Sequence, residues 1–387
     1  MANKSPDRMT WLKRCRRIIV KVGSAVVTSS KGLDRVMIHR LSDQVAELRQ
    51  QQHDVVIVSS GAIASGVRKV GLTERPRTIP HKQAAAAVGQ SVLMQAWEEA
   101  FDKHDLLVAQ VLLTGEDLAQ RHRYLNARNT LETLLEWSIV PIINENDTVA
   151  VEEIKFGDND QLSALMAGLI AADLVISLTD TEGLYDCDPH LHTGARLIPL
   201  VQRLDARVLA CASPESGTVG TGGMMSKLQA AKKCAASGIP MIIAPGKERE
   251  VLLRLLAGED LGTFFVPRQR AYHGRKVWLA HLPKPAGDLI LDAGAMVAME
   301  KGGKSLLPIG IREVRGTFGV GAAVRCLAED GHTIGVGLSN YKSGEIDRIK
   351  GHRSEEIETL IGYKHSDEVI HRNNFVLAGE HLAAETE

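Results

Sequence analysis

Two lysines occupy positions from which a cation could neutralise a phosphate. Lys21 lies near the end of the apolar run Ile18–Val22, shortly before Gly23. A lysine in a buried strand is costly unless it has an anionic partner, so we interpret Lys21 as a cation aimed at a phosphoryl group. Gly23 would let the backbone approach the phosphate oxygens. The alternative is a lysine whose stem follows an edge strand out to the solvent.

The second lysine ends a glycine-rich stretch. Residues 220–227 read Gly-Thr-Gly-Gly-Met-Met-Ser-Lys and precede the helical pattern of Leu228–Ser237. Backbone N–H groups at the start of a helix bind anions, and Lys227 would add a positive charge there. The stretch is not a GxGxxG fingerprint, because Met225 stands where the third glycine would be, and it lacks the GxxxxGK[ST] spacing. A flexible glycine loop is the alternative interpretation.

Ser60 lies in a small-residue turn between a strand and a helix. The sequence Val58–Ala64 runs from apolar residues into Ser-Ser-Gly-Ala. The N–H groups exposed where such a helix opens would bind a carboxylate or a phosphate. A plain Ser-Gly turn would give the same pattern.

Six carboxylates fall within residues 145–160, a density that is usually that of a solvated loop. Two details favour a binding site. Asp160 leads directly into the apolar helical pattern of Gln161–Ala172, so it is expected where that helix meets the sheet. Asn144, Asn146 and Asn159 also supply neutral hydrogen-bonding groups suited to an amino acid.

Strand and helix patterns alternate from residue 17 to about 260, which predicts a three-layer α/β domain with a mainly parallel sheet. The expected strands are continuous apolar runs, as in strands covered on both faces. Ligands gather at the carboxyl ends of such strands, where all the candidates above lie. Strands are expected at Ile18–Val22, Asp54–Ser59, Leu106–Leu113, Ile139–Asn144, Leu174–Leu178 and Pro240–Ala244, and helices at Asp34–Gln51 (with Asp34 as N-cap), Gln83–Phe101, Tyr124–Trp137, Asp160–Ala172 and Ser226–Ser237.

A second domain is predicted after a stretch rich in glycine, proline and arginine. Short strand patterns separated by Gly and Pro favour a small β-barrel. We expect an α/β domain over residues 15–262, a linker over 263–274 and the barrel over 275–375. The expected strands are Lys276–Leu279, Asp288–Leu291, Ser305–Leu307, Ala322–Leu327 and Thr333–Leu338.

Composition excludes several classes of function. The 387 residues are 44% hydrophobic and 24% charged with a formal net charge of −1, so neither a nucleic acid nor an acidic membrane is the expected main partner. No apolar run is long enough to span a bilayer. The five cysteines are scattered without paired spacing, which suits reduced thiols and a cytoplasmic location.

Taken together, the motifs resemble the amino-acid kinase family. The strings at Val58–Ala64, 143–147, 157–160 and 221–227 are similar to those of the members that phosphorylate glutamate. The region 301–320 resembles PUA domains, and the whole resemblance covers roughly residues 17–372. The family often has Thr where Ser226 stands, and the hydroxyl is kept.

This resemblance implies a three-layer αβα amino-acid kinase fold with a mainly parallel sheet, followed by a PUA β-barrel. Lys21 and Lys227 would neutralise charge on the transferring phosphoryl group, and Asp160 would hold both lysines in position. Ser60, Asp147 and Asn159 would bind L-glutamate, giving γ-glutamyl phosphate, the first intermediate of proline synthesis. ATP would be contacted by Lys21, Thr179, Asp180, Thr221, Gly222, Gly223, Met224, Met225, Ser226 and Lys227. The resemblance also implies a homo-oligomer (dimer or tetramer) and proline as a feedback inhibitor.

The implied chemistry agrees with the residues. A γ-carboxylate with a pKa of about 4.3 is ionised at neutral pH, so no general base is needed, and no catalytic His or Cys stands out. Mg²⁺ is expected on the ATP phosphates, held by one or two groups and not by a full protein cage, and no metal-ligating residue is singled out. A free α-ammonium needs a carboxylate partner, for which Asp147 is the candidate.

Two alternatives are open. A sister enzyme of the family could act on N-acetylglutamate or aspartate. The PUA domain could instead make the chain an RNA-binding protein, although the region 276–387 holds fewer basic than acidic residues and no basic stripe.

Overall fold

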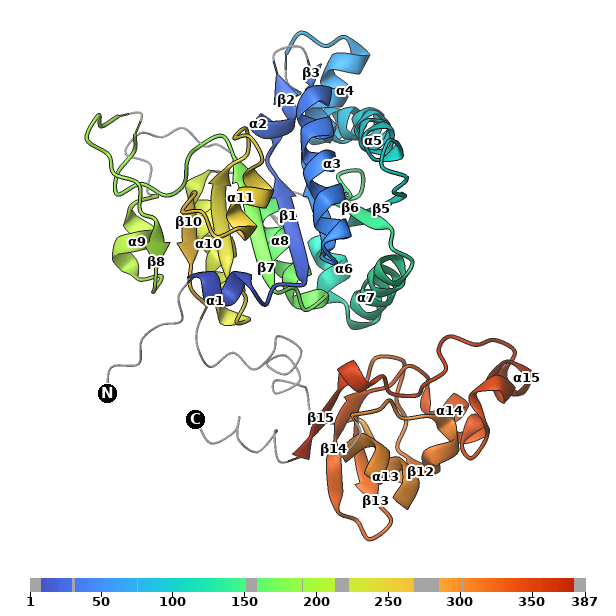
Figure 1. Cartoon of the computed structure of the whole chain (residues 1–387). Helices are drawn as coiled ribbons and strands as arrows, with labels where there is room; N and C mark the ends of the chain where they lie inside the picture. Colours follow the sequence, from blue (N-terminus) through green and yellow to red (C-terminus); the bar gives the residue numbers. More distant parts are fainter. Residues whose placement is uncertain are drawn as a thin grey trace, which may run out of the picture. The chain divides into compact units, whose positions relative to one another are not determined.

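The computed structural model describes residues 8–29, 32–74, 76–150, 159–189, 191–212, 223–267, 285–300 and 303–378 (Figure 1). The chain divides into two compact units, Met1–Ala271 and Tyr272–Glu387. The expected strand Lys276–Leu279 and the glycine-loop residues Thr221 and Gly222 lie outside the described residues.

The first unit is built on an eight-stranded sheet. Its order is β5-β6-β4-β1-β7-β9-β10-β8, and neighbouring strands are parallel except for β9 and β10. All six strands expected in this unit are present, each within two residues of the predicted ends, which confirms the mainly parallel sheet. The strands are β1 (Arg17–Val22), β4 (Asp54–Ser59), β5 (Val108–Leu113), β6 (Val140–Glu145), β7 (Leu174–Thr179), β8 (Leu200–Val201), β9 (Met241–Pro245) and β10 (Thr263–Phe265).

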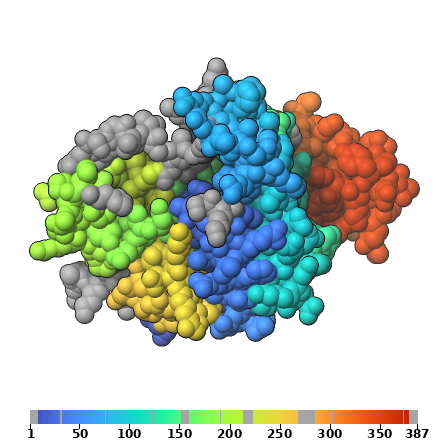
Figure 2. Space-filling model, turned by 90° about the horizontal axis from the view of Figure 1, so that it is seen from above, coloured from blue at the N-terminus to red at the C-terminus, as the bar shows by residue number. Residues whose placement is uncertain are grey.

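Helices cover both faces of this sheet because successive strand side chains enter different cores. In β1, Ile18 and Val20 join one apolar cluster, whereas Ile19 joins the other. The first cluster is covered by α1 (Arg8–Leu12), α3 (Arg35–Gln50), α5 (Ile79–Asp102) and α11 (Val251–Leu256), and the second by α7 (Arg121–Glu136), α8 (Asn159–Leu169) and α10 (Met224–Ala236). Figure 2 shows α3 in blue beside α11 in yellow on the first face.

Short elements connect these layers. Asp34 caps α3 as predicted, since its side chain accepts a hydrogen bond from the backbone N–H of Met37 at 3.0 Å. The remaining elements of the unit are α2 (Ser24–Val27), β2 (Thr28–Ser29), β3 (Gly32–Leu33), α4 (Ala62–Val70), α6 (Gly115–Ala119) and α9 (Ala206–Ala210).

The register of the sheet brings several strand ends together. Lys21 pairs with Val58 of β4 on one side and with Ser177 of β7 on the other. Because these strands are parallel, the residues that follow each of them emerge at the same edge of the sheet. The chain segments after β1, β4, β6 and β7 therefore form one polar rim.

The second unit holds a five-stranded sheet in the order β12-β11-β13-β14-β15. Strands β11 and β13 are parallel, and the other neighbours are antiparallel. The expected strand Ser305–Leu307 is wrong, since Leu306 makes an isolated bridge with Ile370 instead. The strands are β11 (Gly287–Leu291), β12 (Ile311–Arg315), β13 (Ala323–Ala328), β14 (Thr333–Leu338) and β15 (Phe375–Leu377), with helices α13 (Ala293–Glu300), α14 (Ser343–Ile349) and α15 (Ile357–Ile361).

The expected linker of residues 263–274 begins too early. Thr263–Phe265 form β10, which pairs with both β9 and β8. Phe264 and Phe265 are buried in the two cores of the first unit. The pairing of a three-residue strand depends on neighbours distant in the chain, which its own sequence does not reveal.

Candidate active site

A carboxylate held between two lysines lies at the polar rim. Asp160 Oδ1 is 2.7 Å from Lys21 Nζ, and Asp160 Oδ2 is 3.2 Å from Lys227 Nζ. The lysines come from β1 and α10, and the aspartate from the first turn of α8. All three are buried, with 4% of Lys21, 5% of Lys227 and 0% of Asp160 exposed. The structure thus brings together the three residues expected to handle the phosphoryl group.

The electrostatics of this triplet keep Asp160 ionised. Burial alone would raise the pKa of Asp160, but the charges of Lys21 and Lys227 and hydrogen bonds from Lys21 and Ser177 outweigh it, so the pKa lies below its usual range. One negative charge between two positive ones leaves the triplet with a net positive charge. A buried net positive charge that opens on a strand edge favours an anionic ligand.

Two polar side chains that the sequence analysis did not single out support this triplet. Ser177 Oγ donates to Asp160 Oδ1 at 2.9 Å, from the strand next to Lys21. Gln161 Nε2 donates to the backbone oxygen of Ser226 at 2.9 Å and so ties α8 to the first turn of α10. Ser177 could have been found, since it interrupts the apolar run Leu174–Leu178; Gln161 carried no such signal.

Gly23 lies where the ends of two neighbouring strands approach each other closely. Its N–H donates to the oxygen of Leu178 at 3.0 Å, which joins the ends of β1 and β7. A Cβ at this position would lie 3.1 Å from that oxygen and 3.9 Å from Lys21 Nζ. A side chain here would therefore press on the Leu178 oxygen and on the junction of the two strand ends.

A second cluster, the amide cluster, consists of Ser60, Asn144 and Asn159. Asn159 Nδ2 donates to Ser60 Oγ at 2.8 Å, to Asn144 Oδ1 at 3.0 Å and to the Ser59 oxygen at 3.2 Å. Because Asn159 immediately precedes Asp160, the amide cluster adjoins the lysine pair. Asn159 Oδ1 is buried and has no hydrogen-bond partner among the described residues.

Asp147 lies in the turn that follows β6. Burial raises its pKa to about 6, and no nearby cation is among the causes of this shift. Asp147 is half-buried, and a carboxylate partly withdrawn from water without a cation suits a residue that would pair with a positively charged group. Among the described residues, no hydrogen bond or ion pair joins Asp147 to the amide cluster.

The candidates for nucleotide contact are divided between two elements. Thr179 is buried at the end of β7 and donates to Asp180 Oδ1 at 3.1 Å, whereas Asp180 is exposed. Gly223 is the N-cap of α10, followed by the half-buried Met224, Met225 and Ser226. Gly223 has exposed backbone, as an anion cradle requires.

The structure describes no protein cage for a metal. Outside the undescribed segments, no group of three or more His, Cys, Asp or Glu side chains could hold a metal ion. In the same described segments, none of the helices combines the length and apolarity needed to cross a membrane.

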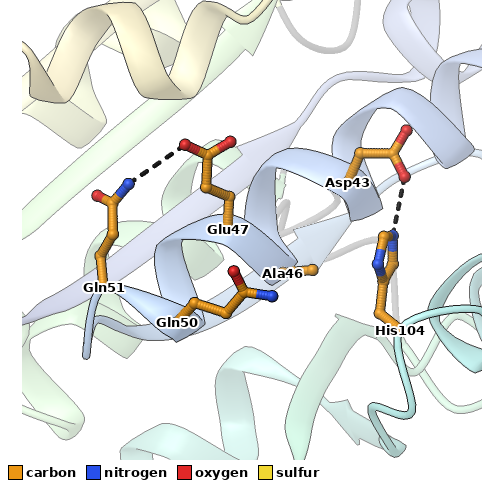
Figure 3. A pocket seen from close by; sticks show the side chains of 6 residues that line it. All are labelled: Asp43, Ala46, Glu47, Gln50, Gln51 and His104. Carbon is orange, nitrogen blue, oxygen red and sulfur yellow. Dashed lines mark hydrogen bonds and ion pairs between the residues drawn. The ribbon is translucent and has the colours of Figure 1, made fainter.

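A pocket of about 400 Å³ lies elsewhere, on α3 and the turn that precedes β5 (Figure 3). Its lining includes Asp43, which lies 2.8 Å from His104 Nε2, and the end of α3 at Gln50. Since α3 ends where the chain turns into the start of β4, this pocket faces the amino ends of the strands. It is separate from the polar rim that carries Lys21.

Comparisons with known proteins agree with the fold. The model of the amino acid kinase family matches residues 16–245, and that of the PUA domain matches residues 287–361. Glutamate 5-kinase of Meiothermus ruber is 59% identical over 365 residues, covering 94% of this chain and 96% of that protein. Glutamate 5-kinase of Thermus thermophilus is 53% identical over 365 residues (94% and 98%). Glutamate 5-kinase of Pelobacter propionicus is 50% identical over 371 residues (96% and 100%).

The chain belongs to the amino acid kinase family and carries a C-terminal PUA domain. Within that family it is similar, over nearly its whole length, to glutamate 5-kinases from several bacteria. The expected fold class and the expected family are both confirmed.

Proposed function

We propose that this protein transfers the γ-phosphoryl group of ATP to the γ-carboxylate of L-glutamate, forming γ-glutamyl phosphate for proline biosynthesis. The observation that carries the proposal is the buried Lys21–Asp160–Lys227 triplet at the carboxyl edge of the sheet. The family membership and the similarity to glutamate 5-kinases point to the same reaction.

The triplet would act by positioning and charge neutralisation. The attacking γ-carboxylate and the γ-phosphate are both anionic, so the two lysines would offset their repulsion as they approach. Asp160 binds one ammonium group through each of its carboxylate oxygens, which would keep both fixed before the substrates bind. Because the acceptor is already ionised at neutral pH, no proton has to be removed from it.

Recognition of the acceptor would use the amide cluster and Asp147. Ser60 and Asn159 would contact the glutamate, and the unpartnered Asn159 Oδ1 would accept a hydrogen bond from its α-ammonium. Asp147 would supply the opposite charge. An N-acetylated acceptor has no ammonium to neutralise that carboxylate, so this site favours free glutamate over N-acetylglutamate.

ATP would lie against Lys21, Thr179, Asp180 and the start of α10 from Gly223 to Lys227, with Thr221 and Gly222 as further candidates. Mg²⁺ neutralises phosphate charge in kinase reactions, and here it would be carried by the ATP phosphates. The described residues do not form a metal cage, and Asp160 is committed to two lysines. No step is therefore assigned to a protein-bound ion.

Other features are proposed from the family resemblance. They are a homo-oligomeric assembly (dimer or tetramer) and feedback inhibition by proline. A cytoplasmic location is proposed from the scattered cysteines. Nucleic acid is not a proposed partner, because the PUA unit has no excess of basic residues. The PUA domain is proposed to act in regulation or assembly.

The test is ATP turnover with Mg²⁺ and hydroxylamine, which traps acyl phosphates as hydroxamates. L-Glutamate, N-acetylglutamate and L-aspartate are compared at equal concentrations. We expect hydroxamate with L-glutamate and much less with the others. Hydroxamate formation with N-acetylglutamate or aspartate alone would contradict the substrate, and no turnover with any acceptor would contradict the kinase activity.

A further inference from the structure

Ser59, the last residue of β4, is fully buried although its side chain is polar. Successive side chains of a strand point to opposite faces, so Ser59 points with Val55 and Ile57 into the first apolar cluster, beneath α5. Ser60 points to the other face, where its Oγ accepts from Asn159 at the start of α8. Ser59 therefore supports the end of β4 from the face opposite the amide cluster.

The Ser59 hydroxyl lies between one donor and one acceptor. Trp97 Nε1, from α5, donates to Ser59 Oγ at 3.1 Å, and an indole N–H can only donate. The Ser59 hydroxyl donates its own proton to the backbone oxygen of Ser60 at 3.2 Å, and a carbonyl oxygen can only accept. The direction of both hydrogen bonds therefore follows from the chemistry of the groups.

The second of these hydrogen bonds holds the peptide group between Ser60 and Gly61. The peptides on either side have partners of their own. The Ser60 N–H donates to the Val22 oxygen at 3.1 Å, which fixes the peptide before it. The Gly61 oxygen accepts from the Ser65 N–H at 2.9 Å, which fixes the peptide after it. Among the described residues, the Ser60 oxygen has no donor besides the Ser59 hydroxyl.

The orientation of this peptide decides where the Gly61 N–H points. The peptide is trans, so its N–H and its C=O point in opposite directions. Because the Ser60 oxygen is drawn toward Ser59 on the α5 face, the Gly61 N–H is directed to the α8 face, where Lys21 meets Asp160. Within the part of the chain that the structure describes, this N–H has no acceptor. Gly61 is also the N-cap of α4, with a φ of 112° that favours glycine.

We propose that Ser59 is a positioning residue that aims the Gly61 N–H at the γ-carboxylate of the acceptor. A carboxylate offers only acceptor oxygens, and its charge strengthens a hydrogen bond from a backbone N–H. The N–H groups at the start of α4 also carry the partial positive charge of a helix end. This inference rests on the proposed function and names a residue that orients the acceptor site without touching the substrate.

Loss of the Ser59 hydroxyl would release this peptide. The Ser60 oxygen would have no donor, and the peptide could rotate about its two flanking bonds because Gly61 has no Cβ to restrict it. The Gly61 N–H would then be directed at the carboxylate for less of the time, so the acceptor would bind less tightly. The lysine pair has separate supports in Ser177 and Gln161, so ATP binding and the chemical step should be affected far less.

The experiment compares two buried serines. Ser59→Ala removes the hydroxyl behind the acceptor site. Ser42→Ala is the matched control, because Ser42 is equally buried and its hydroxyl bonds to the backbone oxygens of His39 and Ala100, which tie α3 to α5 and not to the polar rim. Trp97→Phe, alone and combined with Ser59→Ala, removes the other hydrogen bond of Ser59. For each variant of the full chain, KM for L-glutamate, KM for ATP, kcat and Tm are measured.

We expect Ser59→Ala to raise KM for L-glutamate about tenfold, the equivalent of one hydrogen bond to a charged group. KM for ATP and kcat should stay within about threefold, and Ser42→Ala should lower Tm while both KM values stay within about threefold of wild type. Trp97→Phe should raise KM for L-glutamate no more than Ser59→Ala does. It should add nothing to KM in the double variant, because it acts through Ser59.

An unchanged KM for L-glutamate in Ser59→Ala overturns the inference, as does an equal rise in both KM values. If Ser59→Ala does not fold, Ser59→Cys decides, because a thiol is a weak donor: a raised KM for L-glutamate alone supports the inference, and an unchanged KM overturns it. If the wild-type protein makes no glutamate-dependent hydroxamate, the proposed function itself fails and the inference falls with it. Wild-type activity with an unchanged Ser59→Ala enzyme removes the inference alone.

Discussion

The substitution Asp160→Asn tests how much the buried triplet contributes to stability. It keeps the shape of the side chain and removes the charge that lies between Lys21 and Lys227. Two ammonium groups would then stay buried, each about 5% exposed, without their counter-charge. Breaking a buried ion pair in this way costs about 3–5 kcal/mol, and we take the lower end because the new amide oxygen can still accept one hydrogen bond. That is a fall in Tm of roughly 6–12 °C for a unit of this size.

The matched control is Asp43→Asn. Asp43 also lies between two cationic partners, 2.6 Å from Lys103 Nζ and 2.8 Å from His104 Nε2, but half of its side chain is exposed. An exposed pair contributes less than about 1 kcal/mol. The two substitutions therefore differ mainly in burial.

The assay is thermal and urea unfolding followed by tryptophan fluorescence, at neutral pH and without nucleotide. The pH dependence gives an independent readout. Since the pKa of Asp160 is depressed in the fold, its contribution is complete above the unfolded-state pKa of about 3.9 and is lost as the pH falls below that value. The Asp160→Asn protein should therefore lose less unfolding free energy on acidification than the wild-type protein loses. If Asp160→Asn destabilises the protein no more than Asp43→Asn does, the reasoning about the triplet is refuted.

Two further predictions concern Asp147 at the polar rim and the close packing of α4 on α5. Because burial raises the pKa of Asp147 to about 6, kcat/KM for L-glutamate should fall as the pH drops through 6 and the carboxylate gains a proton. Asp147→Asn should lower kcat/KM and flatten the acidic side of this pH profile. An unchanged acidic side in that variant would assign the titration to another group. Gly89→Ala should cost about 1–3 kcal/mol or more of unfolding free energy, since its Cβ would lie 1.8 Å from the Ala62 oxygen. Gly168→Ala in α8 should be neutral or stabilising, because the new Cβ would lie 4.0 Å from Ser237 Oγ. Equal effects of the two substitutions would contradict the close packing of α4 on α5.

The sequence alone predicted the parallel sheet and the residues of the phosphoryl site. Continuous apolar runs such as Leu174–Leu178 occur where both faces of a strand are covered, so these runs predicted the positions of the strands. Lys21 stood out because a lysine is unusual in such a run. Lys227 stood out at the end of a glycine-rich stretch before a helix, and the family resemblance implied that Asp160 holds the two lysines. The structure joins both lysines to Asp160.

The parts that were missed depend on contacts distant in the chain. Strand β10 exists because β9 and β8 lie beside it, and β15 is only three residues long. Gln90 and Trp97 lie on α5 in a pattern that periodicity predicts as helix, but nothing local shows that they reach Asn144 and Ser59. Side-chain hydrogen bonds between elements are set by the packing and not by local propensity.

The most direct test of the account is the kcat of Lys227→Met in the hydroxamate assay, with Lys232→Met as control. Both lysines lie on α10, but Lys227 is buried against Asp160, whereas Lys232 is exposed. Removing one group that stabilises transition-state charge lowers kcat about 10²–10³-fold, so we expect that loss in Lys227→Met and no change in Lys232→Met. A Lys227→Met enzyme with kcat within about threefold of wild type would contradict the assignment of the triplet to phosphoryl transfer.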